Sequence, residues 1–230
     1  MKIGILQTGQ SPDTLRPEQG DYPGMFERLL EGHGFEFKTW LVEEMDFPDS
    51  PQDADGWLIT GSKHGVYEDH PFIPPLEQLV RDAMAARVPV VGICFGHQLM
   101  AQALGGKVEK FPGGWAIGPQ TYDIEGTTMT VNAWHQDQII TPPPGARVIA
   151  SNGFCRYAGL AYDDLGWSVQ PHPEFGDAFI RGLIRTRAVG VVPDAQLRDA
   201  EAALGQPLDS PAVGDRIAEF LKRAAGRANS

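Results

Sequence analysis

The chain has 230 residues, 42% of them hydrophobic, and its 19 Lys and Arg stand against 30 Asp and Glu, for a formal net charge of −11 at pH 7. This length and composition suit one large domain, or one domain with an appendage, that buries a full core. The charge argues against a nucleic-acid binder and against attachment to an anionic membrane, because both need clustered Lys and Arg.

The first half of the chain predicts alternating strands and helices. Asp21 is placed to cap the first helix, and the run from Val88 to Cys94 is the clearest buried strand. The expected elements are strands over Met1–Leu6, Phe35–Val42, Trp57–Thr60 and Val88–Cys94, and helices over Met25–Leu30, Leu76–Ala86 and His97–Leu104. Such alternation predicts an α/β fold with an open, mostly parallel sheet flanked by helices.

The second half is richer in strand signals. Short strand-like pieces separated by Gly and Pro run from Lys107 to Trp134. Further strands are expected at Arg147–Ala150, Tyr157–Ala161 and Trp167–Val169, and helices at Phe175–Arg187 and Ile217–Arg223. We therefore expect one α/β domain with a strand-rich second half.

Several classes of site and location are disfavoured by what the chain lacks. It holds no apolar stretch long enough for a signal peptide or a membrane span. It has two cysteines, Cys94 and Cys155. These are expected to be separate thiols of a cytoplasmic protein. No His or Cys cluster has zinc-ligand spacing, so no metal and no other cofactor is expected. A small-molecule substrate is the favoured partner, with no nucleic acid and no membrane.

Cys94 is the leading candidate for a nucleophile. It lies between an apolar strand and a helix, with Gly92 two residues before it and Gly96 two residues after it. This arrangement is typical of a nucleophile elbow, a turn too crowded for side chains at those two positions. The helix that follows favours the thiolate, and the N–H of Phe95 can face a developing oxyanion. A structural cysteine in a sheet core explains a lone cysteine equally well.

His172 and Glu174 form the best candidate pair of base and orienting carboxylate. They are two residues apart, and Pro171 and Pro173 favour the extended backbone on which such residues point the same way. The carboxylate could hold one imidazole nitrogen while the other faces a thiol. A surface loop with an incidental histidine is the alternative.

Together these segments resemble the class I (triad-type) glutamine amidotransferases. The resemblance rests on residues 92–98, Gly-Ile-Cys-Phe-Gly-His-Gln, and on the later Pro-His-Pro-Glu at residues 171–174. It implies Cys94, His172 and Glu174 as the catalytic triad. It also implies Gly61, in a Gly-rich turn after the third strand, as the second oxyanion donor beside Phe95. Gln98 and His135 are implied to bind the amino-acid end of glutamine, although His135 could equally be a structural histidine.

The resemblance also suggests a division of the chain. We expect a glutamine amidotransferase-like catalytic domain over residues 1–187 and a C-terminal helical extension over 188–230, packed on the same domain. Residues 59–69 are similar to a stand-alone subgroup that includes plant γ-glutamyl peptidases. Lys63 and His64 are interpreted as solvated loop residues rather than as lining of the pocket mouth. Cys155 is interpreted as a core or surface residue without a catalytic role.

Three functions remain open at this point. The first is hydrolysis of the glutamine side-chain amide to glutamate and ammonia, for which a separate synthetase subunit would be the partner. The second is a self-sufficient hydrolase of γ-glutamyl peptides or conjugates that uses the same triad. The third is a non-catalytic binding or regulatory module. The intact set Cys94, His172 and Glu174 weighs against the third function, and a cysteine hydrolase of another elbow-bearing α/β family is disfavoured by the His-x-Glu spacing.

Overall fold

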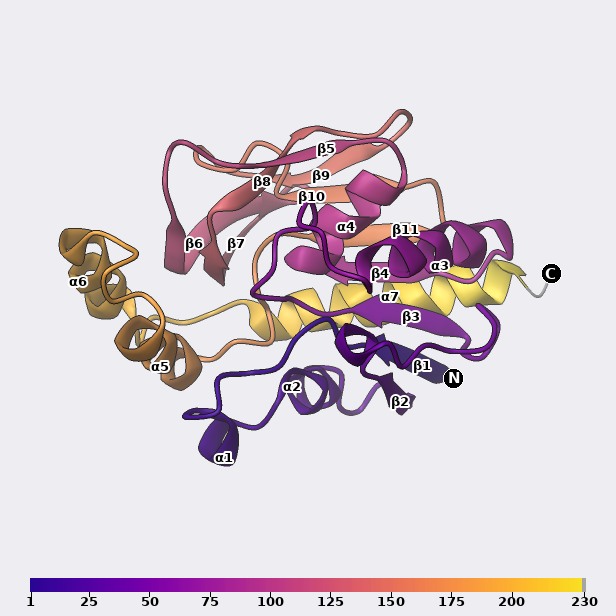
Figure 1. The fold of residues 1–230 in the computed structure, drawn as a ribbon, viewed down its shortest axis with the longest axis horizontal. Coiled ribbons are helices and arrows are strands. Elements are labelled where there is room, and N and C mark those ends of the chain that lie inside the picture. The colour runs from indigo at the N-terminus through magenta and orange to yellow at the C-terminus, as the bar shows by residue number, and fades with distance from the viewer. Residues whose placement is uncertain (229–230) are drawn as a thin grey trace.

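The fold is built on one large sheet. The computed structural model describes residues 1–228, and within them nine strands form this sheet in the order β2-β1-β3-β4-β11-β10-β9-β6-β7, while β5 and β8 form a separate ribbon (Figure 1). The strands are β1 (Lys2–Leu6), β2 (Glu36–Trp40), β3 (Gly56–Ile59), β4 (Val90–Ile93), β5 (Lys107–Lys110), β6 (Ala116–Ile124), β7 (Thr127–His135), β8 (Asp137–Thr141), β9 (Arg147–Ser151), β10 (Gly159–Tyr162) and β11 (Gly166–Val169).

Helices pack against both faces of the sheet. They are α1 (Arg16–Gln19), α2 (Tyr22–Leu29), α3 (Ile73–Ala85), α4 (Phe95–Ala103), α5 (Asp177–Thr186), α6 (Asp194–Ala203) and α7 (Ser210–Ala228), with a 3₁₀ turn, η1, at Val42–Glu44. One core cluster joins α2 and α7 to one face through residues such as Phe26 and Leu221, and a second joins α3 and α4 to the other through residues such as Leu76 and Leu99 (Figure 1). None of the helices within residues 1–228 is long and apolar enough to cross a membrane.

The sheet changes direction along its width. β2, β1, β3, β4 and β11 pair in parallel, and the pairs from β11–β10 through β6–β7 are antiparallel. β3 and β4 are buried at every position, as expected for central parallel strands covered on both faces. These observations confirm the predicted α/β fold, in which the parallel half carries the candidate nucleophile and the second half is rich in strands.

Several elements differ from the sequence-based expectation. The last helix is much longer than the predicted Ile217–Arg223. Its first half was missed because that half is rich in small residues, which weaken the apolar pattern. One of them, Gly214, lies so close to α2 that a Cβ there would be 2.9 Å from the Leu29 carbonyl oxygen. α6 lies within the expected helical extension, but its bounds were not predicted, because its two buried residues, Leu197 and Ala200, give only a weak helical period. Asp21 does cap α2, accepting from the Tyr22 N–H at 2.9 Å.

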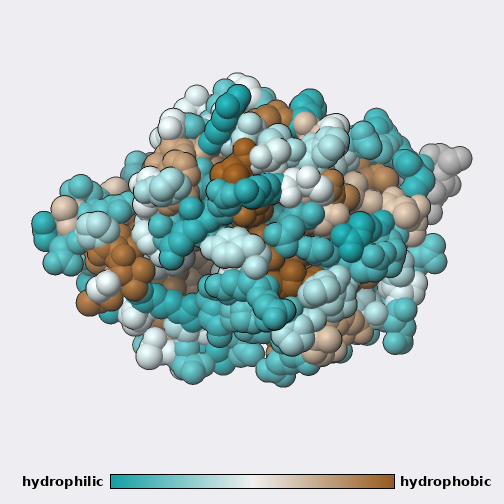
Figure 2. Space-filling model, turned by 45° about the horizontal axis from the view of Figure 1, so that its top comes forward, coloured by the Kyte–Doolittle hydropathy of each residue, from teal (hydrophilic) through white to brown (hydrophobic). Residues whose placement is uncertain are grey.

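α5 and α6 lie together at one end of the molecule (Figure 1). Their connection exposes Val189 and Val191, which are 69% and 59% accessible. Figure 2 shows a hydrophobic patch at this end, whereas much of the visible surface elsewhere is hydrophilic. This connection also forms one wall of the pocket described next.

Candidate active site

The candidate site lies where three neighbouring parallel strands end. Gly61 follows β3, Cys94 follows β4, and Gln170 and His172 follow β11. β4 pairs with β3 on one side and with β11 on the other, so their carboxyl ends meet at one edge. In open α/β sheets ligands bind at this edge. The topology therefore brings together residues that are far apart in the sequence.

Cys94 occupies a strained turn between β4 and α4. Its φ is 52° and its ψ is −102°, a conformation that costs a residue with a side chain about 1–3 kcal/mol. A Cβ on Gly92 would lie 2.5 Å from the Gly96 carbonyl, and one on Gly96 would lie 2.4 Å from the Ile59 carbonyl oxygen. The glycines two residues before and after Cys94 are therefore sterically required, as in a nucleophile elbow.

His172 is held by a carboxylate and by an aromatic ring. Its Nδ1 lies 2.7 Å from Glu174 Oε1, and the two side chains are only 4% and 1% exposed. The Phe175 ring stacks on the imidazole with centroids 4.0 Å apart and planes within 5°. The backbone N–H of His172 donates to the Asn132 carbonyl at 2.8 Å. With Nδ1 donating to Glu174, the other ring nitrogen, Nε2, is free to serve Cys94.

The electrostatics of this pair favour a charged imidazole. Burial alone would lower the pKa of His172, but the Glu174 carboxylate and then the charge and hydrogen bond of Cys94 raise it to about 10. An imidazolium thus lies between two groups that can carry negative charge. This is the charge distribution expected of a thiol activated by histidine.

Gly61 and Phe95 flank the thiol. A Cβ on Gly61 would lie 2.8 Å from His172 Cε1 and 3.7 Å from Cys94 Cβ, so only glycine fits there without displacing the imidazole. The Gly61 carbonyl accepts from the Thr8 and Thr60 hydroxyls, both at 3.1 Å, which holds this peptide in place. Phe95 is the first residue of α4, where a backbone N–H has no acceptor within the helix. Both residues line the pocket.

Gln170 is a site residue that the sequence did not single out. Its Nε2 lies 3.4 Å from Cys94 Sγ, and its Oε1 accepts from Gln98 Nε2 at 3.0 Å. Gln98 Nε2 also donates to the Asp137 carbonyl at 2.9 Å. The pairing of β4 with β11 brings Gln170 to Cys94, because Val169 is opposite Ile93 and the next residues are then neighbours.

His135 lies in the same pocket wall in an electrically neutral state. Burial lowers its pKa to about 3, and its Nδ1 is 3.3 Å from the Asp137 carbonyl oxygen. Its Nε2 is buried with no hydrogen-bond partner among the described residues. A buried ring nitrogen of this kind is suited to contact with a ligand.

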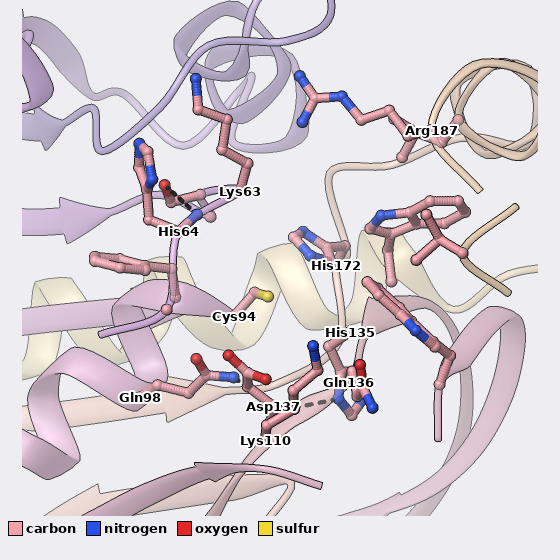
Figure 3. Close-up of a pocket in the computed structure, with 18 of the residues that line it drawn as sticks. Lys63, His64, Cys94, Gln98, Lys110, His135, Gln136, Asp137, His172 and Arg187 are labelled. Atoms are coloured by element: carbon pink, nitrogen blue, oxygen red, sulfur yellow. Dashed lines mark hydrogen bonds between the residues drawn. The ribbon is translucent and has the colours of Figure 1, made fainter. Parts of the chain in front are cut away.

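The pocket around Cys94 has a volume of about 300 Å³. Figure 3 shows Cys94 between the loop carrying Lys63 and His64 on one side and His172 and His135 on the other. Lys63 and His64 both line this pocket, because the chain after β3 folds over the carboxyl edge of the sheet. The Lys63 side chain is also 53% exposed, as expected of a solvated loop residue, whereas that of His64 is only 16% exposed. Beyond Cys94 the walls are partly apolar and comprise Trp115, Trp134, Leu183, Ala188, Val191 and Val192, with Arg187 beside them.

Cys155 lies away from this chemistry. It is 1% exposed in the core cluster that includes α7, and burial raises its pKa to about 12. Its thiol therefore stays protonated at neutral pH.

Comparisons with known proteins place the chain among the glutamine amidotransferases. A model of the family described as Glutamine amidotransferase class-I matches residues 29–178. γ-Glutamyl peptidase 4 of Arabidopsis thaliana is 28% identical over 233 residues, covering 93% of each chain. Glutamine-hydrolysing GMP synthase of Cupriavidus pinatubonensis is 33% identical over 209 residues, covering 74% of this chain and 37% of the synthase. The crystal structure of a glutamine amido transferase from Methylobacillus flagellatus superposes with a TM-score of 0.75 at 26% identity, covering 99% of this chain and 94% of that chain.

Proposed function

Because the chain belongs to the class-I glutamine amidotransferase family, we propose that it hydrolyses a γ-glutamyl amide at Cys94, with glutamine as its leading substrate. The observation that carries the proposal is the strained Cys94 turn beside the buried His172–Glu174 pair at the base of a pocket. A strained turn and a buried ion pair both reduce the stability of the fold. Their occurrence together therefore favours a functional role for these residues over a purely structural one.

The proposed reaction has two halves that share one histidine. The Cys94 thiolate attacks the side-chain carbonyl carbon of glutamine, and the N–H groups of Gly61 and Phe95 donate to the resulting oxyanion. Protonated His172 gives its proton to the amide nitrogen, the C–N bond breaks, and ammonia leaves behind a γ-glutamyl thioester.

Water completes the cycle. Neutral His172 removes a proton from a water molecule, which attacks the thioester carbonyl, and the C–S bond breaks to release glutamate. The proton on His172 restores the starting imidazolium beside the thiolate. Glu174 stabilises the imidazolium at each stage through the 2.7 Å contact with Nδ1.

Two further residues are proposed to hold the substrate. Gln98 presents its amide beside Gln170 and the Asp137 carbonyl, and His135 offers the buried Nε2. Both line the pocket that contains Cys94. Neither would take part in proton transfer.

The extent of the pocket favours a second candidate, a γ-glutamyl peptidase. The pocket continues past Cys94 to Trp115, Trp134, Val191 and Val192, which leaves an apolar wall for a leaving group larger than ammonia. A relative that covers nearly the whole chain is named γ-glutamyl peptidase 4. The GMP synthase relative instead supports an amidotransferase that works with a synthetase, and this chain covers 37% of that protein.

Product analysis separates these candidates. The purified chain is incubated in parallel with glutamine and with a γ-glutamyl dipeptide that has an apolar second residue, and glutamate release is measured for each. Fast release from glutamine supports the leading proposal. Fast dipeptide cleavage with poor use of glutamine favours the peptidase, and Trp115→Leu should then lower kcat/KM for the dipeptide alone. Negligible release from both, with Cys94 still reactive to an electrophile, indicates a subunit that needs its synthetase.

A further inference from the structure

Two histidines and a glutamate converge on the loop after β3, at the rim of the pocket. One ligand atom from each of His64, Glu68 and His70 lies within 4.8 Å of the other two. His70 Nε2 is 2.9 Å and His64 Nδ1 is 3.7 Å from the same oxygen, Glu68 Oε2. The sequence had shown no zinc-ligand spacing, and the proposed hydrolysis uses none of these three side chains.

Two of the three separations are close to those of a tetrahedral zinc site. With Zn–N and Zn–O bonds of about 2.0–2.1 Å, two ligand atoms of a tetrahedral ion lie about 3.3 Å apart. The measured 2.9 Å and 3.7 Å fall on either side of this value. The third separation, between the ligand atoms of His64 and His70, is at most 4.8 Å, so rotation of these side chains would have to shorten it to place all three atoms around one ion.

A neighbouring carboxylate, Glu43, orients one of the proposed ligands. Glu43 Oε1 lies 2.9 Å from His64 Nε2, which leaves the lone pair of His64 on Nδ1, directed at Glu68. A carboxylate that holds the far nitrogen of a metal-binding imidazole is the usual second partner at zinc sites.

The loop itself is held in shape without an ion. The Glu68 N–H donates to the Gly65 carbonyl at 3.1 Å, and the Tyr67 hydroxyl donates to Asp137 Oδ2 at 2.9 Å. The side chains of His64, Glu68 and His70 are 16%, 46% and 32% exposed, so an ion could reach them from solvent. The imidazole centroids of His64 and His70 are 3.9 Å apart, so the two rings lie side by side at the rim of the pocket.

We propose that His64, Glu68 and His70 bind a divalent transition-metal ion, best matched by Zn²⁺, with Glu43 orienting His64. Three protein ligands leave one position open for water, as in zinc sites that are not purely structural. The ion would join residues 64 and 70 across the loop that begins with Gly61, and so restrain this wall of the pocket. The alternative is a hydrogen-bonded cluster in which Glu68 bridges two histidines and no metal binds.

The test measures Zn²⁺ bound to the full chain by equilibrium dialysis, and the visible spectrum of bound Co²⁺. Cys94→Ser is used as the background throughout, because the Cys94–His172 pair could itself capture zinc. We expect one Zn²⁺ per chain at micromolar metal, a tetrahedral Co²⁺ spectrum, and a rise in Tm of about 5 °C at saturating zinc. His70→Ala should weaken binding at least about 100-fold, and Glu43→Gln about 10-fold.

His33→Ala is the matched control. His33 also contacts a carboxylate, with Nε2 3.1 Å from Asp215 Oδ1, but it lies outside the proposed cluster. Its substitution should leave zinc affinity unchanged. A metal-free melt of each variant verifies folding, and His70→Gln replaces His70→Ala if the latter is not folded. Failure of the Cys94→Ser chain to bind Zn²⁺, or binding that is equal with and without His70, would overturn the proposal.

Discussion

Replacing Glu174 with Gln should slow turnover while leaving substrate binding nearly intact. The substitution keeps the shape of the side chain but removes the negative charge that lies 2.7 Å from His172 Nδ1. A hydrogen bond to a charged group contributes about 1.5–3 kcal/mol, which corresponds to about a 10- to 150-fold loss of kcat. The analogous change in the serine triad costs about 10⁴, which sets an upper guide.

The pH profile gives this prediction a second readout. Glu174 is the largest of the interactions that raise the pKa of His172 to about 10, so its neutralisation lets burial lower that pKa. Since the proposed reactive state needs protonated His172, the alkaline limb of kcat/KM should move to lower pH in the variant. KM should change little, because Glu174 contacts the ring nitrogen opposite the one that serves Cys94.

The assay is steady-state glutamate release between pH 5 and pH 10. Glu201→Gln is the matched control, because Glu201 pairs with Arg185 at 3.0 Å on the surface and neither residue lines the pocket. If Glu174→Gln altered kcat by less than about twofold and left the alkaline limb unmoved, the carboxylate would have no role in orienting His172.

The remaining predictions concern the thiol, the turn and stability. A glutamine-like electrophile should label Cys94 and glutamine should protect it, whereas peptide mapping that found the label mainly at Cys155 would refute the assignment, since burial raises the pKa of Cys155 to about 12. Gly96→Ala should lower the free energy of unfolding by about 3 kcal/mol in urea titration. Gly24→Ala is the control: its Cβ would have its nearest neighbour at 3.6 Å, and it should change the free energy of unfolding by less than about 1 kcal/mol. Equal effects of the two substitutions would contradict the crowded turn at Cys94. Because the folded-state pKa of His172 is raised from 6.5 to about 10, its stabilising contribution is complete below pH 6.5 and is lost as pH rises towards 10. The unfolding free energy should therefore fall between pH 7 and pH 10 more steeply in the native chain than in His172→Gln, and parallel slopes would contradict the shift.

The local signals around the candidate nucleophile were the most predictive part of the sequence. Gly92 and Gly96 identified the turn because its crowding involves backbone within a few residues of Cys94 and a neighbouring strand. His172 and Glu174 are two residues apart, so local backbone geometry alone predicted their contact. The sequence also predicted the central strands, because buried parallel strands are short runs of apolar residues.

The features that the sequence did not reveal depend on contacts between distant segments. Gln170 reaches Cys94 through strand pairing across 76 residues, and no local pattern records that pairing. Lys63 and His64 line the pocket because their loop folds over the sheet edge, which their polar character alone did not suggest. His97, the histidine nearest the nucleophile in sequence, is instead fully buried between Ser168 Oγ and the Tyr157 carbonyl, and burial lowers its pKa to about 4.

The central claim is that Cys94 forms a γ-glutamyl thioester, and rapid acid quench followed by intact-protein mass spectrometry tests it most directly. The chain is mixed with glutamine, and with the γ-glutamyl dipeptide in parallel, and is quenched within the first turnovers. We predict a species heavier by one glutamyl residue, mapped to the peptide that contains Cys94 and absent from Cys94→Ser. Turnover of either substrate with no such adduct, or with an adduct on another residue, would contradict the account.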